Sequence, residues 1–227
     1  MTSPESPLIA LVSAVPAAIP PAVAAFAEEF PDARIWNIID DRLLTEVDER
    51  GGLTDELAER MTRLIRHAVT EGADGVLVTC SVYGSVVPGL TGVTVPVLAS
   101  DDAAFAAVLT GGFHSVLLLS PAPNPLKDSV SRLTEAAAAS GADIEIAGAV
   151  AEGAPAAAAA GDVDELTRIL HETYLSSGAP VDAVLLGQYS LAPAGARLAE
   201  LIDVPVLTAP GRAAAALRAA LETPGQA

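Results

Sequence analysis

The sequence is poor in cysteine, histidine and aromatic residues, with one cysteine, three histidines and 4% aromatics among 227 positions. One cysteine excludes an internal disulfide, and three scattered histidines with one thiol do not give the spacing of a metal site. Lysine and arginine are also scarce, 12 against 29 acidic residues, for a net charge of −17. That charge repels phosphate backbones. We therefore expect a small-molecule partner, no nucleic acid, no metal and no cofactor.

Long apolar runs are absent as well, although 51% of the residues are hydrophobic. No run reaches the roughly 18 to 20 uninterrupted residues of a membrane-spanning helix. The N-terminal segment has Glu5 before its apolar stretch and neither Lys nor Arg. A signal peptide needs a basic segment there. The sequence thus predicts a cytoplasmic protein with no membrane partner.

Short apolar runs alternate with helical patterns along the chain. Nearly continuous apolar sequence is typical of parallel strands that helices cover on both faces. Strands are predicted at residues 8–12, 33–38, 75–79, 94–98, 115–119, 144–147, 183–186 and 204–207. Helices are predicted at 54–69, at 126–140 after an Asn124-Pro125 cap and first turn, and at 162–175, with the alanine tract 151–161 as a loop leading into a helix. The alternation predicts a doubly wound α/β fold.

An internal repeat divides the chain. Asp74-Gly-Val-Leu-Val-Thr-Cys80 aligns with Asp182-Ala-Val-Leu-Leu-Gly-Gln188, 108 positions further on. Val95-Pro-Val-Leu98 recurs as Val204-Pro-Val-Leu207, and Ile9-Ala-Leu-Val-Ser13 as Val116-Leu-Leu-Leu-Ser120, at nearly the same offset. The repeat predicts two pseudo-symmetric lobes, each a parallel sheet flanked by helices. Residues 1–100, completed by a C-terminal helix at 208–227, form the first lobe, and residues 101–207 form the second.

The repeat also predicts where the site lies. Ligands of parallel sheets bind beyond the carboxyl ends of the strands. Facing lobes would place four residues around one cleft between them: Ser13, Cys80, Ser120 and Gln188. Cys80 precedes a turn and a short helix at 85–90, whose N–H groups would lower the pKa of the thiol and hold a substrate carboxylate. The alternative is that Cys80 is a small buried hydrophobic residue.

Other candidates near the strand ends are polar. The hydroxyls of Ser13, Ser81, Ser120 and Ser190 form a donor set for a carboxylate, or each serine is an ordinary turn or cap residue. Asn37, followed by Asp40, Asp41 and Arg42, comes after the second strand and could point into the cleft. Alternatively, the two aspartates cap a turn and Arg42 neutralises them. Tyr83 and Tyr189 donate protons and close the pocket, or they pack with a hydrogen-bonding tip.

At these residues the sequence resembles the aspartate/glutamate racemase superfamily, which includes hydantoin racemase, maleate isomerase and arylmalonate decarboxylase. The resemblance rests on Val78-Thr-Cys80-Ser81, Asn37-Ile-Ile-Asp-Asp-Arg-Leu-Leu44, Val95-Pro-Val-Leu98 and Asp182-Ala-Val-Leu-Leu-Gly187. It implies two α/β lobes and cofactor-free chemistry at the carbon next to a carboxylate, with two cysteines on opposite faces of that carbon in the racemases. Gln188 stands where the second thiol would be. An amide is neither acid nor base near neutral pH, so two-thiol racemisation is excluded.

The resemblance favours a racemase-like or isomerase-like enzyme in which Cys80 acts on a small carboxylic acid. Three one-thiol schemes stay open. Cys80 protonates the enediolate left by decarboxylation of a malonate-type acid, or it adds as a nucleophile in a maleate-type isomerisation. In the third scheme it exchanges a proton on one face while Tyr189, Tyr83 or water serves the other. A non-catalytic protein that binds a small acid is the alternative class, and a homodimer is compatible with this fold class.

Overall fold

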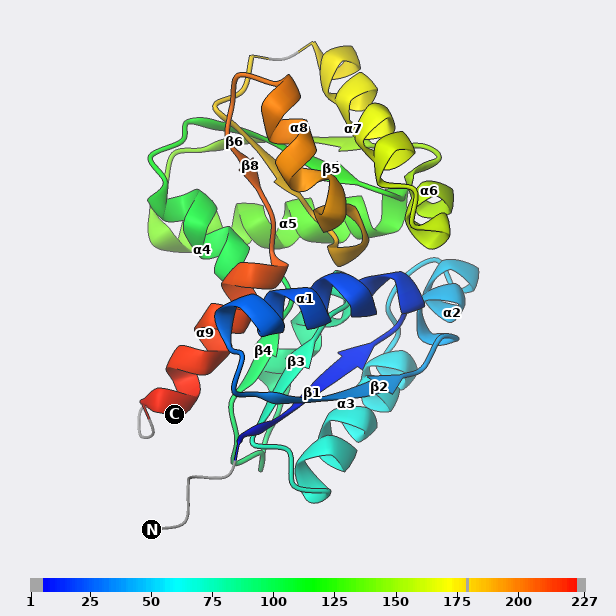
Figure 1. Ribbon diagram of the computed structural model, residues 1–227, viewed down its shortest axis with the longest axis vertical. Helices are drawn as coiled ribbons and strands as arrows, with labels where there is room; N and C mark the ends of the chain where they lie inside the picture. Colours follow the sequence, from blue (N-terminus) through cyan, green and yellow to red (C-terminus); the bar gives the residue numbers. More distant parts are fainter. Residues whose placement is uncertain (1–5, 179, 224–227) are drawn as a thin grey trace. The chain divides into compact units, whose positions relative to one another are not determined.

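The computed structural model describes residues 6–178 and 180–223, and the chain divides into two compact units (Figure 1). Unit 1 comprises the described residues of Met1–Ser100 and Pro210–Ala227, and unit 2 comprises those of Asp101–Ala209. Within the described part of the chain, no helix has the length and apolar character needed to cross a membrane.

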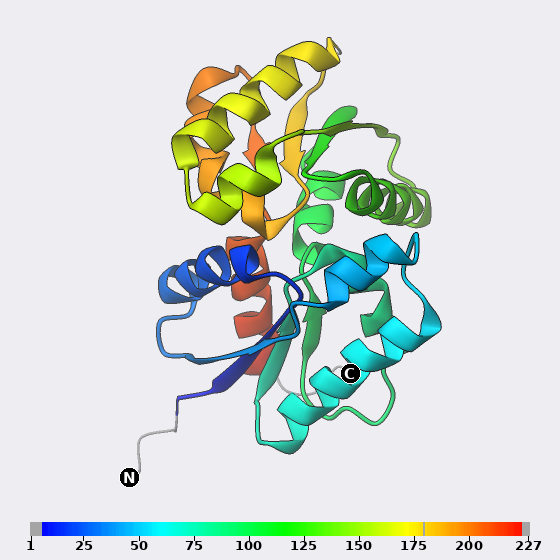
Figure 2. The same ribbon diagram turned by 90° about the vertical axis from the view of Figure 1, so that its right-hand side faces the viewer.

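Unit 1 is built on a four-stranded parallel sheet of order β2-β1-β3-β4. The strands are β1 (Leu8–Ser13), β2 (Arg34–Ile39), β3 (Gly75–Val78) and β4 (Val97–Ala99). Helices α1 (Ile19–Glu29) and α9 (Pro210–Glu222) lie on one face of the sheet, and α2 (Leu43–Glu49) and α3 (Asp55–Thr70) lie on the other (Figure 2). Two 3-10 helices, η1 (Pro16–Ala18) and η2 (Ser81–Gly89), complete the unit.

Unit 2 repeats this plan with a parallel sheet of order β6-β5-β7-β8. Its strands are β5 (Ser115–Ser120), β6 (Glu145–Val150), β7 (Ala183–Leu186) and β8 (Val206–Leu207). Helix α5 (Pro123–Ser140) packs on β5 and β6 beside α4 (Asp102–Thr110). The remaining helical elements are α6 (Ala154–Ala160), α7 (Val163–Ser177), η3 (Tyr189–Ala194) and α8 (Gly195–Leu201). The predicted α/β class, with two parallel sheets flanked by helices, is confirmed.

In each unit, one helix follows, along the chain, the last strand of the other unit's sheet. Helix α4 follows β4 of unit 1 but packs against α5 in unit 2. Helix α9 follows β8 of unit 2 but packs against α1, β3 and β4 in unit 1. The two helices are equivalent in the repeat, so the exchange is reciprocal.

All eight predicted strands are present, but β4 and β8 are shorter than predicted. Each begins directly after a proline, Pro96 or Pro205, and not at Thr94 or Val204. Proline has no N–H to donate to a ladder. The proline carbonyls still accept hydrogen bonds, from the Val76 and Val184 N–H groups at 2.9 Å each.

Helices α3 and α7 each begin at a residue whose side chain caps the helix. The Thr54 side chain accepts a hydrogen bond from Leu57 N, and the Asp162 side chain accepts one from Glu165 N. These bonds satisfy N–H groups that have no partner within the helix.

Two helix predictions were wrong in part. Helix α5 begins at Pro123 with Ala122 as its N-cap, so Asn124 lies in the first turn and is not a cap. The alanine tract is mostly helix and not mostly loop: α6 spans Ala154–Ala160 between Gly153 and Gly161, both with positive φ (86° and 68°). Glycine adopts this left-handed conformation readily, so it can stand both before the first residue and after the last residue of a short helix.

The aspartate that opens each repeated block has a structural role. The Leu8 N–H donates to Asp74 Oδ2 at 2.7 Å, and the His114 and Ser115 N–H groups donate to Asp182 Oδ2 at 2.7 and 3.0 Å. Each carboxylate therefore ties the amino end of one strand (β3, β7) to that of its neighbour (β1, β5). The hydrogen bond from the His114 backbone is the main cause that lowers the pKa of Asp182.

Candidate functional site

Cys80 lies at the carboxyl edge of the unit 1 sheet, between β3 and η2. It is the N-cap residue of η2, with extended φ and ψ of −107° and 117°, and its carbonyl accepts a hydrogen bond from Tyr83 N at 3.1 Å. The residue is 8% exposed. The helix therefore starts directly after Cys80, at Ser81, and not at residue 85 as predicted. Ser81 is buried in its first turn.

Ser13 and Thr79 form a buried hydroxyl pair beside Cys80. Ser13 Oγ and Thr79 Oγ1 are 2.8 Å apart and join the carboxyl ends of β1 and β3. Thr79 also donates to the Val12 carbonyl, from its N–H at 3.0 Å and from its hydroxyl at 3.4 Å. Ser13 is completely buried. Its predicted role as a carboxylate donor stays a prediction.

Tyr83 is also completely buried, and its hydroxyl donates to the Leu43 carbonyl at 3.1 Å. Burial, followed by the nearby Cys80 thiol, raises the pKa of Tyr83 well above its ordinary value. The phenol is therefore neutral near pH 7, and its proton bonds the start of α2. This geometry fits the alternative of a packed tyrosine with a hydrogen-bonding tip.

The expected position of Asn37 was wrong. Asn37 lies within β2, in register with Leu11, and is exposed. Of the four candidate residues in this segment, only Asp40, Asp41 and Arg42 follow the strand, because the strand extends to Ile39. Asn37 is thus set back from the carboxyl edge where Cys80 lies, and substrate binding by it stays a prediction.

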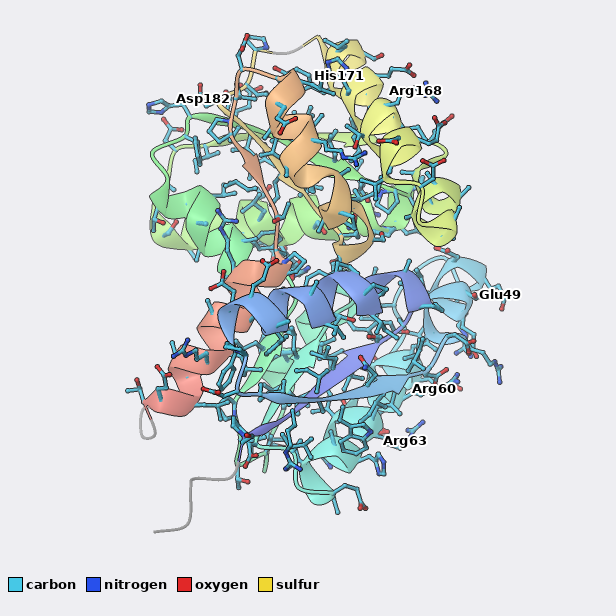
Figure 3. All side chains as sticks on the ribbon, viewed as in Figure 1. Glu49, Arg60, Arg63, Arg168, His171 and Asp182 are labelled. Carbon is cyan, nitrogen blue, oxygen red and sulfur yellow. The ribbon has the colours of Figure 1, made fainter. Side chains whose placement is uncertain are left out.

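Asp40 caps the turn after β2 and belongs to a network of ion pairs. Its Oδ1 accepts from Arg42 N at 3.3 Å, as the turn alternative predicted. Arg42, however, pairs with Glu46 at 2.8 Å, and the partner of Asp40 is Arg60 of α3, at 2.6 Å. Arg60 also binds Glu46 at 2.8 Å, and its hydrogen bond is the main cause that lowers the pKa of Glu46. Figure 3 labels Arg60.

Gln188 holds the corresponding position in unit 2. It is the N-cap residue of η3, with extended φ and ψ of −132° and 149°, and its carbonyl accepts a hydrogen bond from Leu191 N at 3.0 Å. The residue is half-buried. Gln188 thus has the same extended N-cap conformation as Cys80, and its carbonyl accepts the equivalent hydrogen bond.

The other unit 2 candidates surround the same sheet edge. Ser120, completely buried at the end of β5, donates to the Ala122 carbonyl at 3.0 Å within its own turn. Tyr189 is buried in η3 beside half-buried Ser190. Burial, and then the nearby Asp101 carboxylate, raises the pKa of Tyr189 well above its ordinary value. Tyr189 is therefore also a neutral phenol at pH 7.

Sequence reasoning missed a buried ion pair in unit 2. Arg132 of α5 binds both carboxylate oxygens of Asp101, pairs with Asp128 at 2.9 Å, and lies over the Phe105 ring at 5.2 Å from its centroid. The Asp101 side chain is 3% exposed. Asp101 and Arg132 are far apart in sequence, so the one signal in the sequence is the position of Asp101, two residues after the apolar strand β4.

One hollow of about 400 Å³ lies in unit 1 between α3 and the later part of η2. It is lined by Leu53, Thr54, Asp55, Ala58, Glu59, Thr62, Ser85, Val86 and Gly89, and so by none of the candidate residues. Within residues 6–178 and 180–223, no group of three or more His, Cys, Asp or Glu is placed to hold a metal ion.

The structure thus gathers Ser13, Cys80, Ser81 and Tyr83 at one sheet edge, and Ser120, Gln188, Tyr189 and Ser190 at the equivalent edge of the other unit. That both edges line one cleft stays a prediction.

The fold is similar to that of solved racemases. An aspartate racemase from Picrophilus torridus is 15% identical, with a TM-score of 0.70 over 95% of this chain and 94% of that one. A glutamate racemase from Bacillus anthracis is 12% identical (TM-score 0.72, 96% and 83%), and an allantoin racemase from Klebsiella pneumoniae is 18% identical (0.70, 94% and 87%). No protein-family model and no curated protein sequence matches the chain. The chain therefore shares its fold with these racemases, and this is the fold that the sequence resemblance implied.

Proposed function

We propose that this protein is a cofactor-independent, isomerase-like enzyme in which Cys80 acts on the carbon next to the carboxylate of a small acid. The observation that carries the proposal is the position of the chain's single thiol. Cys80 lies at the carboxyl edge of a parallel sheet and at the N-terminus of η2, in a fold shared with racemases. Ligands of parallel sheets bind at that edge, and helix N-termini favour anions, including a thiolate.

Gln188 restricts the reaction to one thiol. In a racemase-like step the Cys80 thiolate takes the proton from the α-carbon, whose electron pair moves into the carboxyl group as an enediolate. The carbon then regains a proton from Cys80 or, on the other face, from water; in the second case the hydroxide that is left takes the proton from the Cys80 thiol and restores the thiolate. Gln188 cannot supply that second proton, because an amide does not ionise near neutral pH. It can hydrogen-bond the substrate, as can the hydroxyls of Ser81 and Ser190.

A one-thiol decarboxylase is the second candidate, because Gln188 in place of a second thiol suits a reaction that needs a single proton donor. The bond between the α-carbon and one carboxyl group of a malonate-type acid breaks, and CO₂ leaves. Its electron pair forms the enediolate, which takes one proton from the Cys80 thiol. The thiolate then regains a proton from water. Donors that stabilise the enediolate charge are needed in both schemes.

Incubation of small α-substituted acids and malonates in deuterated water separates the candidates. Deuterium at the α-carbon without CO₂ release indicates the isomerase-like reaction, whereas deuterium together with CO₂ indicates decarboxylation. Cys80→Ala is expected to abolish either reaction while the far-UV circular dichroism spectrum is kept. Neither outcome across a broad panel, or full activity of Cys80→Ala, would refute the proposal.

Thiol labelling separates an enzyme from a small-acid-binding protein. We expect rapid iodoacetamide labelling of Cys80 near pH 7 that a dicarboxylate suppresses. Labelling only above about pH 8.5, the range of an unperturbed thiol, would favour the binding protein or an inert buried cysteine.

We also propose that the working protein is a cytoplasmic homodimer whose ligand is a small carboxylic acid. Sedimentation at several concentrations tests the dimer, and cell fractionation tests the location. A monomer at micromolar concentration, or recovery outside the cytoplasm, would contradict these two points without affecting the chemistry at Cys80.

A further inference from the structure

We propose that Thr79 and Tyr83 are positioning residues whose hydroxyl groups fix the backbone on either side of Cys80 and so aim its thiol. The inference rests on the proposed role of Cys80, but it concerns residues that need not touch the substrate. Both hydroxyls are buried, and both bond main-chain or side-chain atoms of elements other than their own.

Thr79 fixes the residue before the thiol. Its hydroxyl is 2.8 Å from Ser13 Oγ and donates to the Val12 carbonyl at 3.4 Å, the same carbonyl that accepts from Thr79 N. Two atoms of Thr79 thus attach the end of β3 to the end of β1. Reorientation of the Val78–Thr79 peptide or of the Thr79 side chain would break these buried hydrogen bonds, each of which is costly to leave unmade.

Tyr83 fixes the residues after the thiol. Its N–H donates to the Cys80 carbonyl at 3.1 Å, and its hydroxyl donates to the Leu43 carbonyl at 3.1 Å. The first turn of η2 is thereby attached to the start of α2. The Leu43 N–H in turn donates to the Asp40 carbonyl at 3.2 Å, and Asp40 is held by Arg60. The segment from Cys80 to Tyr83 is therefore anchored through α2 to an ion-pair network.

The second half of the chain shows that the fold does not require either hydroxyl. The counterpart of Thr79 is Gly187, where a Cβ would lie 2.8 Å from Leu118 Cδ2, and the counterpart of Tyr83 is Leu191. The strand, the extended N-cap residue and the bond from Leu191 N to the Gln188 carbonyl all form there regardless. Both hydroxyls occur only in the half that carries the thiol, which is why we assign them to Cys80 and not to the fold.

The test compares Thr79→Val and Tyr83→Phe, which remove a hydroxyl and keep the shape, with Thr167→Val and Tyr174→Phe in unit 2. Thr167 is buried and bonds the Val163 carbonyl at 2.7 Å, and Tyr174 packs against the unit 2 core. The measurement is the rate of iodoacetamide labelling of Cys80 at the high-pH plateau. There the thiol is fully ionised, so the rate reports its orientation and not its pKa.

We expect Thr79→Val and Tyr83→Phe each to change the plateau rate about 2- to 10-fold, the range that the loss of one hydrogen bond allows. Thr79→Ser, which keeps the hydroxyl, should restore the wild-type rate, and the two control variants should leave it unchanged. Wild-type plateau rates in both Thr79→Val and Tyr83→Phe, or equal changes in the controls, would overturn the inference. If a test variant unfolds, Ser13→Ala, which removes the partner of Thr79 and leaves Thr79 in place, carries the same expectation.

The labelling rate is measured without substrate, so the positioning role of Thr79 and Tyr83 can be refuted independently of the proposed reaction at Cys80. Variants that label like the wild type while Cys80 still turns over an acid would refute positioning alone. Altered labelling with no turnover of any acid would refute the proposed reaction alone. Where an acid is turned over, kcat should fall in the test variants with little change in KM, because orientation of the thiol affects the chemical step.

Discussion

Gly187 should not tolerate a methyl group. It follows β7 at the position that Thr79 holds in unit 1, and a Cβ built there would lie 2.8 Å from Leu118 Cδ2 and 3.3 Å from the Leu119 carbonyl oxygen. Carbon atoms in contact are normally about 3.5 to 4.0 Å apart. Leu118 is completely buried and cannot swing into solvent. Gly187 has no positive φ, so crowding is the only strain that a side chain would introduce.

Overpacking of this kind costs about 1 to 3 kcal/mol. For a chain of this size each kcal/mol corresponds to a change in Tm of about 2 to 4 °C. We therefore expect Gly187→Ala to lower the Tm by about 2 to 12 °C in thermal unfolding followed by circular dichroism. Gly89→Ala is the matched control, because a Cβ there meets nothing within 4 Å and φ is again not positive.

A double-mutant cycle tests the cause. Leu118→Ala alone should cost about 2 to 5 kcal/mol, since it leaves a cavity in the unit 2 core. Combined with Gly187→Ala it should cost less than the sum of the two single changes by about 1 to 3 kcal/mol, because the clash is then absent. Additivity within about 0.5 kcal/mol, or an equal loss in Gly89→Ala, would refute the reasoning.

Three further predictions follow from the described contacts. Asp182→Asn should destabilise the protein above about pH 5, because the folded state lowers the pKa of Asp182. The difference from wild type in the free energy of urea unfolding should shrink as the pH falls below 3.8, the ordinary pKa of an aspartate. A difference that grows as the pH falls would contradict this. Arg132→Met should cost about 3 to 5 kcal/mol in urea unfolding, since it leaves the Asp101 carboxylate buried without its arginine, whereas Arg168→Met on the surface should cost under about 1 kcal/mol; equal losses would argue against a buried pair. Thr54→Ala should cost about 1 kcal/mol by removing the cap of α3, while Thr54→Ser should cost much less; no difference between the two would show that the cap contributes nothing.

The sequence predicts the layers of this fold well, because burial on both faces of a parallel sheet requires nearly continuous apolar runs. Runs such as Val116 to Leu119 therefore locate each strand. The repeat adds the equivalence of Cys80 and Gln188, which the backbone geometry at both residues bears out. Pro96 and Pro205 shift two strand starts, which the lack of a proline N–H explains.

The surroundings of the candidate residues are not predictable in the same way. The partners of Asp40 and Tyr83, which are Arg60 and the Leu43 carbonyl, come from helices on one face of the unit 1 sheet. Sequence periodicity says which face of a helix is buried but not which polar atoms meet there. Serine after a strand is equally ambiguous: Ser13 bonds a neighbouring strand, whereas Ser120 bonds its own turn.

The reciprocal exchange of α4 and α9 sets the order in which the protein can fold as it leaves the ribosome. The strands of unit 1 precede unit 2 in the chain, yet their sheet is covered by α9, whose Ala213, Ala214 and Leu217 are buried. Until residues 210–222 emerge, β3 and β4 lack part of their apolar cover. Unit 2 is continuous and can close earlier. The sheet that is made before unit 2 is therefore completed after it, and its uncovered apolar surface is open to aggregation while residues 101–209 are synthesised.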